Sequence, residues 1–197
     1  TMKSLEESKT LKTKSIVIDI GGTNFRSSIF EFNKKLLLKP RRILTQNFLN
    51  NPGLKIKSLQ NLLIQQILET VKFYLNKDKS INLVGISFPA PITSTGIVHQ
   101  ACTLWGDRGR NFPLLKILSQ KLPGMHLVVV NDITAAAERY ASMNKYKNID
   151  FFEIITVSSG IGNKIYDVSK GKVILDKRSI GGEMGHIKVD FSKIQKT

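Results

Sequence analysis

The first group of residues suited to chemistry forms a glycine-rich turn. Residues 15–20 read Ser-Ile-Val-Ile-Asp-Ile and lead into Gly21, Gly22, Thr23 and Asn24. Adjacent glycines let backbone amides approach an anion closely, and the Thr and Asn side chains add hydrogen-bond donors. A carboxylate near the end of the apolar run, Asp19, is placed to hold magnesium through water. The pattern predicts a phosphate-binding turn, with an ordinary Gly-Gly hairpin as the alternative.

A second turn of the same character lies nearer the carboxyl terminus. Residues 158–163 read Ser-Ser-Gly-Ile-Gly-Asn, with Gly160 and Gly162 between two runs of strand character. One such turn is readily explained as a hairpin. Two of them, one in each half of the chain, favour a phosphate ligand held from both sides.

Between these turns, Asn131 and Asp132 follow an apolar run and precede an alanine-rich segment. An Asn or Asp at a helix start is commonly only a cap, which stabilises the helix by about 1 kcal/mol. The functional interpretation is that the Asp132 carboxylate accepts a proton from an attacking hydroxyl while Asn131 hydrogen-bonds a neighbouring hydroxyl. The dipeptide alone does not separate these two interpretations.

A third cluster, residues 181–186, reads Gly-Gly-Glu-Met-Gly-His. Glycines at this density bring the backbone close to another group. Glu183 and His186 are of the side-chain types that hold sugar hydroxyls or a metal ion. A single Glu or His is more often structural, so the functional interpretation depends on the glycines around them.

Alternating strands and helices must position these residues. Apolar and β-branched runs predict strands over residues 15–20, 26–32, 35–44, 83–88, 126–130, 153–157, 163–168 and 172–175. Apolar residues that recur every three to four positions predict a helix over residues 54–75. Shorter helices are expected over residues 113–122 and 133–143. This alternation predicts an α/β fold.

The composition narrows the remaining classes of protein. A chain of 197 residues with 41% hydrophobic residues can bury a core, and its apolar stretches are too short to span a membrane. The single cysteine, Cys102, cannot form an internal disulfide, which fits a cytoplasmic location. The formal charge of +15 favours an anionic partner such as ATP. Aromatic residues are not interleaved with the basic ones, so a nucleic-acid surface is not expected.

Five segments, which occur along the chain in the family's order, resemble one protein family. Residues 19–26, Asp-Ile-Gly-Gly-Thr-Asn-Phe-Arg, resemble the first phosphate loop of actin-like sugar kinases and of eukaryotic hexokinases. Residues 182–186, Gly-Glu-Met-Gly-His, resemble a motif of the ROK family, which includes bacterial glucokinases and N-acetylhexosamine kinases. Residues 131–138 resemble that family's catalytic Asn-Asp and alanine-rich helix. Residues 85–89 and 104–106 are similar to its sugar-side loops.

The resemblance implies an actin-like ATPase (ribonuclease H-like) fold, with a complete N-terminal lobe over residues 1–131 and an incomplete second lobe over residues 132–197. It also implies an ATP-dependent hexose or N-acetylhexosamine kinase that uses Mg²⁺. The residues implied to hold the ATP phosphates and magnesium are Asp19, Gly21, Gly22, Thr23, Asn24, Gly160 and Gly162. Those implied to bind the sugar are Pro89, Ala90, Asn131, Asp132, Glu183 and His186, with Asp132 also acting as the general base.

The sequence departs from the family pattern at three places. The family has Gly where Ala90 follows the proline, so the added methyl group is expected to reshape the sugar pocket. The second turn has Ser-Ser-Gly in place of Gly-Thr-Gly. The chain ends soon after His186, where the family continues to a cysteine-rich zinc site, another sugar-binding Glu and the adenine-binding helices. No zinc site is therefore predicted at His186.

The early ending has a consequence for the second lobe. Strands over residues 153–175 would expose an apolar sheet face of a size that monomers rarely tolerate. The alternatives are a fragment of a longer protein, a redesigned lobe, or a homo-oligomer or partner chain that covers the face.

Two other functional classes are open to the sequence. A non-catalytic homologue would bind a sugar or a partner without transferring phosphate. A nucleic-acid-binding regulator would suit the high charge, since the ROK family also includes repressors. About 14 residues precede the first predicted strand, too few for a helix-turn-helix module, which disfavours the regulator.

Overall fold

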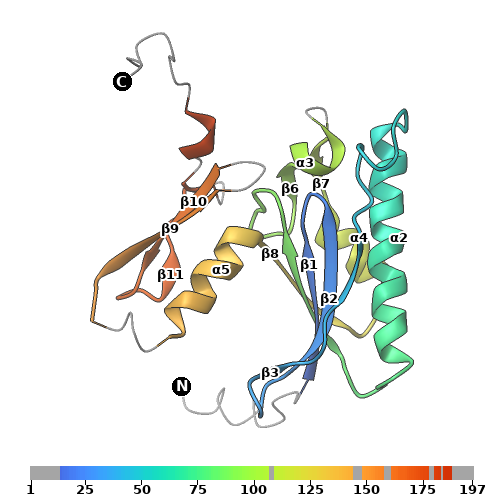
Figure 1. Cartoon of the computed structure of the whole chain (residues 1–197), viewed down its shortest axis with the longest axis horizontal. Helices are drawn as coiled ribbons and strands as arrows, with labels where there is room; N and C mark the ends of the chain where they lie inside the picture. Colours follow the sequence, from blue (N-terminus) through green and yellow to red (C-terminus); the bar gives the residue numbers. More distant parts are fainter. Residues whose placement is uncertain are drawn as a thin grey trace, which may run out of the picture. The chain divides into compact units, whose positions relative to one another are not determined.

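The structure, a computed structural model, describes residues 14–106, 109–143, 148–157, 161–177, 180–182 and 184–187. Strands and helices alternate along the chain (Figure 1), as the sequence predicted. The strands are β1 (Lys14–Ile20), β2 (Asn24–Glu31), β3 (Leu36–Leu37), β4 (Arg41–Leu44), β5 (Leu83–Phe88), β6 (Val98–Gln100), β7 (Arg110–Phe112), β8 (His126–Asn131), β9 (Phe151–Val157), β10 (Ile161–Asp167) and β11 (Lys172–Val173). The helices are α2 (Ile56–Leu75), α3 (Cys102–Trp105), α4 (Leu114–Lys121), α5 (Asp132–Ala141) and the short 3₁₀ helix η3 (Met184–His186). The chain divides into two compact units, Thr1–Asp132 and Ile133–Thr197.

The first unit is built on a six-stranded sheet of order β3-β2-β1-β5-β8, in which β4 also pairs with β2. Strands β1 and β2 form an antiparallel hairpin, whereas β1, β5 and β8 run parallel. The three parallel strands end at Ile20, Phe88 and Asn131. In open sheets of this kind, the carboxyl ends of parallel strands form the edge where ligands bind.

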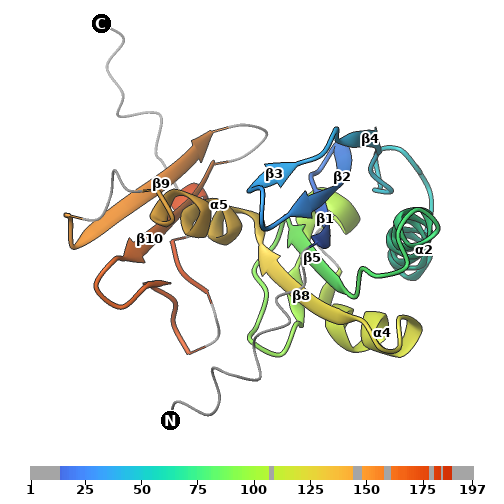
Figure 2. The same cartoon turned by 90° about the horizontal axis from the view of Figure 1, so that it is seen from below.

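Helix α2 covers one face of this sheet because its apolar residues recur at helical spacing. Leu59, Leu63, Ile67 and Val71 are buried, and they belong to the same cluster as Ile16, Ile18 and Ile20 of β1. Burial of each such side chain contributes about 1.5–3 kcal/mol. Figure 2 shows α4 on the same side of the sheet as α2. Within the described residues, no helix is long and apolar enough to cross a membrane.

Two parts of this unit differ from the sequence prediction. The single strand expected over residues 35–44 is two short strands, β3 and β4, with Pro40 in the gap between them. Proline lacks the N–H group that a continuous strand would donate, which accounts for the break. The elements β6, α3 and β7 were not predicted. They surround Trp105, whose ring lies 5.9 Å from Phe88 and 5.1 Å from Phe112 between centroids.

The second unit contains an antiparallel sheet of order β11-β10-β9. Helix α5 lies along this sheet (Figure 1) and packs Ala137 against Tyr166 and Val173, with Phe152 and Ile154 beside them. Alternate residues of a strand point to opposite faces, so the intervening residues form a second face. Its apolar members are exposed and are called here the outer apolar face: Phe151, Ile155, Val157, Ile161 and Ile165.

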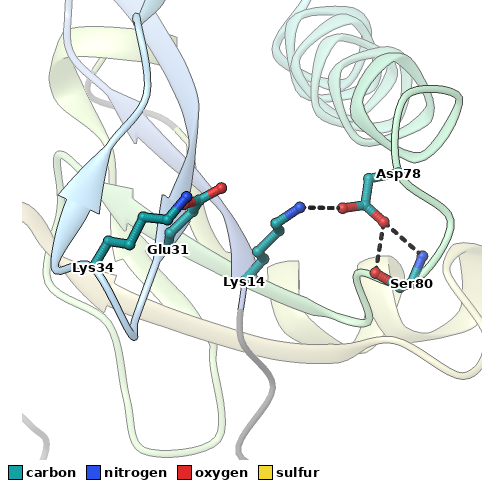
Figure 3. A network of polar contacts seen from close by, with 5 residues as sticks. All are labelled: Lys14, Glu31, Lys34, Asp78 and Ser80. Carbon is teal, nitrogen blue, oxygen red and sulfur yellow. Dashed lines mark hydrogen bonds and ion pairs between the residues drawn. The ribbon is translucent and has the colours of Figure 1, made fainter.

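An ion pair connects the start of β1 to the loop after α2 (Figure 3). The Lys14 Nζ atom lies 2.8 Å from Asp78 Oδ2, and Ser80 donates to Asp78 Oδ1 from both its amide and its hydroxyl. These hydrogen bonds from Lys14 and Ser80 lower the pKa of Asp78 to about 2. A second pair in the same figure joins Lys34 to Glu31 within the β2–β3 turn.

Candidate active site

Three of the segments singled out in the sequence lie at one edge of the first-unit sheet. The register pairs Asp19 of β1 with Ser87 of β5, and Phe88 of β5 with Asn131 of β8. The Gly21 turn follows β1, Pro89 and Ala90 follow β5, and Asp132 follows β8. The fold therefore places these segments side by side at the carboxyl ends of adjacent parallel strands, as a ligand site in an α/β sheet requires.

The turn between β1 and β2 is tight. The Gly21 amide donates to the Asn24 carbonyl oxygen at 2.9 Å. A Cβ atom at Gly21 would lie 3.1 Å from that same oxygen, and one at Gly22 would lie 3.4 Å from the Thr103 Cβ atom. The distance at Gly21 is shorter than an ordinary van der Waals contact. A side chain at that position would press on the backbone of the turn, so a glycine is favoured there.

The segment of residues 45–47 fixes three carbonyl groups of this turn. Gly21 O accepts from the Thr45 hydroxyl at 2.8 Å, Gly22 O accepts from the Asn47 side-chain amide at 2.5 Å, and Thr23 O accepts from the Thr45 amide at 3.0 Å. Thr45 is 0% exposed and Asn47 is 1% exposed. In turn, the Gln66 side chain of α2 donates to Leu44 O and accepts from Gln46 N.

This fixation determines where the turn's N–H groups point. A trans peptide unit carries its C=O and N–H on opposite sides. Since the carbonyl groups face the 45–47 segment, the amides of Gly22, Thr23 and Asn24 face away from it. Among the described residues, the Gly22 and Thr23 amides have no hydrogen-bond acceptor. Amides presented in this way suit an anion such as phosphate.

Asp19 is held beside this turn by its neighbours in the sheet. Its Oδ1 atom accepts from the Ser87 hydroxyl at 3.0 Å, and its Oδ2 atom accepts from Arg26 Nη1 at 2.9 Å. The Asp19 side chain remains 47% exposed. A half-exposed ion pair contributes little to stability, so its main effect is to orient the carboxylate. A carboxylate that is already hydrogen-bonded suits a hydrated magnesium ion, which usually keeps several of its waters.

The segment after β5 and the Asn131-Asp132 dipeptide are in direct contact. The Asn131 side-chain amide donates to Ala90 O at 3.2 Å and to Asp132 Oδ1 at 2.9 Å. Asn131 and Asp132 are both half-buried. Ala90 is buried within the hydrophobic cluster of the first unit, which is where its methyl group packs.

The second predicted phosphate turn is only partly described. Residues 158–160, and with them Gly160, lie outside the described residues. Gly162 lies inside strand β10, where a side chain would collide with the end of the Ile133 side chain from the first turn of α5. This packing gives Gly162 a structural role, and its assignment to a phosphate turn stays a prediction.

In the third cluster, Gly182 and Gly185 lie against strand β10. A Cβ atom at Gly182 would collide with the Asn163 backbone, and one at Gly185 would collide with Ile161 O. Gly182 has a φ of +84°, and the Met184 amide donates to Asn163 Oδ1 at 2.9 Å. The close approach expected from these glycines is therefore an approach to β10. Glu183 and the side chain of His186 lie outside the described residues.

The sequence reasoning missed four residues that shape this site. Thr45 and Asn47 fix the carbonyl groups of the turn, Ser87 orients Asp19, and Arg42 contacts Asn24. No local motif marks them, although the polar run Thr-Gln-Asn directly after an apolar strand was an available signal. Within the part of the chain that the structure describes, no group of three or more His, Cys, Asp or Glu side chains is arranged to hold a metal ion.

Solved structures share this architecture. The ROK family glucokinase from Streptomyces griseus, determined in complex with glucose and AMPPNP, is similar with a TM-score of 0.66 at 21% identity, over 90% of this chain and 51% of that chain. The inorganic polyphosphate/ATP-glucomannokinase from Arthrobacter sp. strain KM is similar with a TM-score of 0.67 at 26% identity, over 90% of this chain and 65% of that chain. The chain has the α/β fold of the actin-like ATPases, as predicted.

Sequence comparison identifies the family within this class. The ROK family profile matches residues 15–195. The C(7)-cyclitol 7-kinase of Streptomyces hygroscopicus subsp. limoneus is 33% identical over 180 residues, which make up 90% of this chain and 49% of that protein. The glucokinase of Thermotoga maritima is 26% identical over 182 residues, which make up 91% of this chain and 52% of that protein. The chain belongs to the ROK family, and it spans about half the length of the curated relatives it matches.

Proposed function

We propose that this protein takes part in the ATP-dependent phosphorylation of a sugar or cyclitol, with transfer of the γ-phosphate to one hydroxyl group. The observation that carries the proposal is the order of three segments at one sheet edge: the amide-lined turn after β1, Pro89 and Ala90 after β5, and Asp132 after β8. Relatives named as cyclitol kinase and glucokinase support this class of acceptor.

The donor side of the site consists of the turn and Asp19. The Gly22 and Thr23 amides face away from the buried 45–47 segment and have no acceptor among the described residues. They would bind phosphate oxygens, with the Asn24 side chain alongside. Asp19 would hold a hydrated magnesium ion next to them. Gly160 and Gly162 are proposed to contact the phosphates from the second unit.

The acceptor side lies two strands away. Neighbouring strands are about 4.8 Å apart, so β1 and β8 are separated by about 10 Å, which leaves room for an acceptor hydroxyl and a phosphate group in line. Asn131, held by its bond to Ala90 O, would orient the acceptor. Pro89, Ala90, Glu183 and His186 are proposed to line the rest of the sugar site.

The chemistry follows from these positions. ATP, when bound, supplies the phosphoryl group. Asp132 would take the proton of the attacking hydroxyl as the oxygen–phosphorus bond forms and the bond to ADP breaks. Catalysis of phosphoryl transfer depends mainly on the positioning of the reactants and on stabilisation of negative charge. The amides of the turn would contribute to both.

A test of this proposal measures ADP release by the full chain with Mg²⁺ and ATP over a panel of acceptors: glucose, N-acetylmannosamine and a C7 cyclitol. We expect ADP release that requires an acceptor and Mg²⁺. Acceptor binding, measured by calorimetry, without ADP release for any acceptor would contradict it. That result would favour the alternative, a non-catalytic sugar-binding homologue.

A further inference from the structure

Four polar side chains form a row across the first-unit sheet beside the phosphate-binding turn. Arg42 of β4 is paired with Arg26 of β2, Arg26 with Asp19 of β1, and Asp19 with Ser87 of β5. Residues that are directly paired across strands share a face of the sheet. The row lies on the face opposite Phe25, which is buried in the core.

The row contains an unbalanced positive charge. Arg26 forms an ion pair with Asp19 at 2.9 Å. Arg42 lies directly opposite Arg26 but forms no ion pair within the described residues, and its Nε atom donates to the neutral side-chain oxygen of Asn24 at 2.8 Å. Like charges directly opposite each other on neighbouring strands are destabilising. The Arg42 charge is therefore not neutralised by an acidic side chain among the described residues.

Arg42 lies beside the turn between β1 and β2, where its charge can act on an anionic ligand. Asn24 closes the turn whose Gly22 and Thr23 amides have no acceptor among the described residues. Its bond to Arg42 holds the guanidinium group at that turn. An arginine carries five N–H donors in a planar fork that matches phosphate oxygens, and among the described residues only the Nε donor of Arg42 is used.

We infer that Arg42 binds the terminal phosphates of the phosphoryl donor, together with the amides of the turn. The inference rests on the proposed function, because it assigns a further residue to the donor side of the same site. It names a residue from an edge strand, outside the glycine-rich motif, as a determinant of donor affinity.

The chain provides a matched control in the adjacent residue. Arg41 carries the same charge on the same strand, but alternate residues of a strand point to opposite faces. Its guanidinium carbon lies 4.8 Å from the centroid of the Phe73 ring, on the α2 side of the sheet. Arg41→Ala therefore changes the net charge as Arg42→Ala does, without touching the phosphate-binding turn.

The experiment measures binding of inorganic triphosphate with Mg²⁺ to the full chain by calorimetry, and thermal unfolding of the same samples. For Arg42→Ala we expect about tenfold weaker binding, as for loss of a charged hydrogen bond. Its unfolding temperature should be unchanged or higher, because the opposed charges are relieved. Arg42→Lys, which keeps the charge but loses the fork, should bind with intermediate affinity. Arg41→Ala should change binding by less than about twofold, since screened surface charge has little effect.

Equal affinities for Arg42→Ala and the unaltered protein would overturn the inference and leave the proposed function standing. Equal losses of triphosphate affinity in Arg41→Ala and Arg42→Ala would also overturn it, because they would indicate an effect of net charge alone. A failure of the unaltered protein to bind triphosphate or ATP would overturn the proposed function, and the role of Arg42 with it.

Discussion

At the scale of single residues, Asp132 is the side chain on which the proposed chemistry depends most. Asp132→Asn keeps an oxygen that can accept the bond from Asn131, but it cannot take a proton. We expect kcat to fall by about 10²–10⁴-fold, the usual contribution of a general base, with the acceptor dissociation constant nearly unchanged. Steady-state kinetics and calorimetry measure the two quantities. Asp150→Asn, at an exposed aspartate directly before β9, is the control, and kcat retained in Asp132→Asn would exclude Asp132 as the base.

Thr45 is the residue that most directly fixes the proposed phosphate-binding turn, Gly21–Asn24. Thr45→Val keeps the shape of the side chain but removes the hydroxyl that donates to Gly21 O. A carbonyl left without its donor costs about 1–3 kcal/mol when buried. We therefore expect lower thermal stability and a higher KM for ATP. Thr45→Ser retains the hydroxyl and should restore the KM, whereas equal KM values for the Val and Ser variants would contradict this role.

These residues also show how far the sequence predicts the site. The Gly21–Asn24 turn and the Asn131-Asp132 dipeptide were visible because their chemistry lies in adjacent residues. Thr45, Asn47 and Ser87 act on groups that are 20 or more positions away in sequence, so their roles depend on the register of the sheet. A single sequence gives no direct signal for such register, because a buried Thr or Asn looks like any other polar residue.

At the scale of elements, the segment that contains η3 packs closely on strand β10, because its glycines leave no room for a side chain between the two backbones. Gly185→Ala would push a methyl group into the Ile161 carbonyl, a backbone atom that cannot move aside easily. We expect a loss of about 1–3 kcal/mol, as for other overpacked sites. Faster hydrogen exchange over residues 181–187 would confirm it. Gly85→Ala is the control, because a Cβ atom there meets nothing within 4 Å; equal effects of both variants would contradict the proposed packing.

The link between β1 and the end of α2 should weaken in acid. Asp78 has a pKa lowered from 3.8 to about 2 by its bonds to Lys14 and Ser80. A lowered carboxylate pKa means that the stabilisation is present above about pH 4 and is lost as the pH falls towards 2. Asp78→Asn should therefore lower the unfolding temperature at pH 6, and the difference from the unaltered protein should shrink between pH 4 and pH 2. A difference that stays constant over this range would contradict the assignment.

The difference in unfolding temperature between Asp78→Asn and the unaltered protein reports on the Asp78 carboxylate alone. The pKa of Asp167 is also lowered to about 2, by bonds from Lys170 and Ser169 at the end of β10. Both proteins contain this group, so its contribution cancels in the difference.

The strands and helices themselves were largely predictable because their periodicity is local. The 3.6-residue spacing of Leu59, Leu63 and Ile67 places α2 correctly, and its packing on β1 follows from the apolar stripe. The region from Val98 to Phe112 was not assigned, because its strands and helix are three to four residues long. Elements this short form through tertiary packing around Trp105 rather than through sequence periodicity.

At the scale of the whole molecule, the outer apolar face of β9 and β10 favours association. Apolar side chains exposed on one face of a sheet commonly mark a contact with another protein surface, and here they lie beside the polar Glu153 and Asn163. We expect the unaltered protein to self-associate with rising concentration, and Ile155→Lys to reduce this association while changing stability by no more than about 0.5 kcal/mol. Sedimentation velocity measures the first and thermal unfolding the second. Leu62→Lys, an exposed residue of α2 in the first unit, is the control.

The outcome separates two explanations for that face. Association that is unchanged by Ile155→Lys would show that the face is not the contact between copies of the chain. An equal reduction of association by Leu62→Lys would show that added net charge, on a chain that already carries +15, is the cause.

The hydrogen bonds from Thr45 and Asn47 to the glycine turn have a consequence for the rate of ligand binding. They join groups of the chain itself, so they order the turn during folding, and its conformational entropy is lost at that stage. Contact with phosphate can then contribute its free energy to affinity instead of to the ordering of a loop. Under the proposed function, the phosphoryl donor would bind to a turn that is already ordered, and its association rate would depend on diffusion and on the net positive charge of the chain.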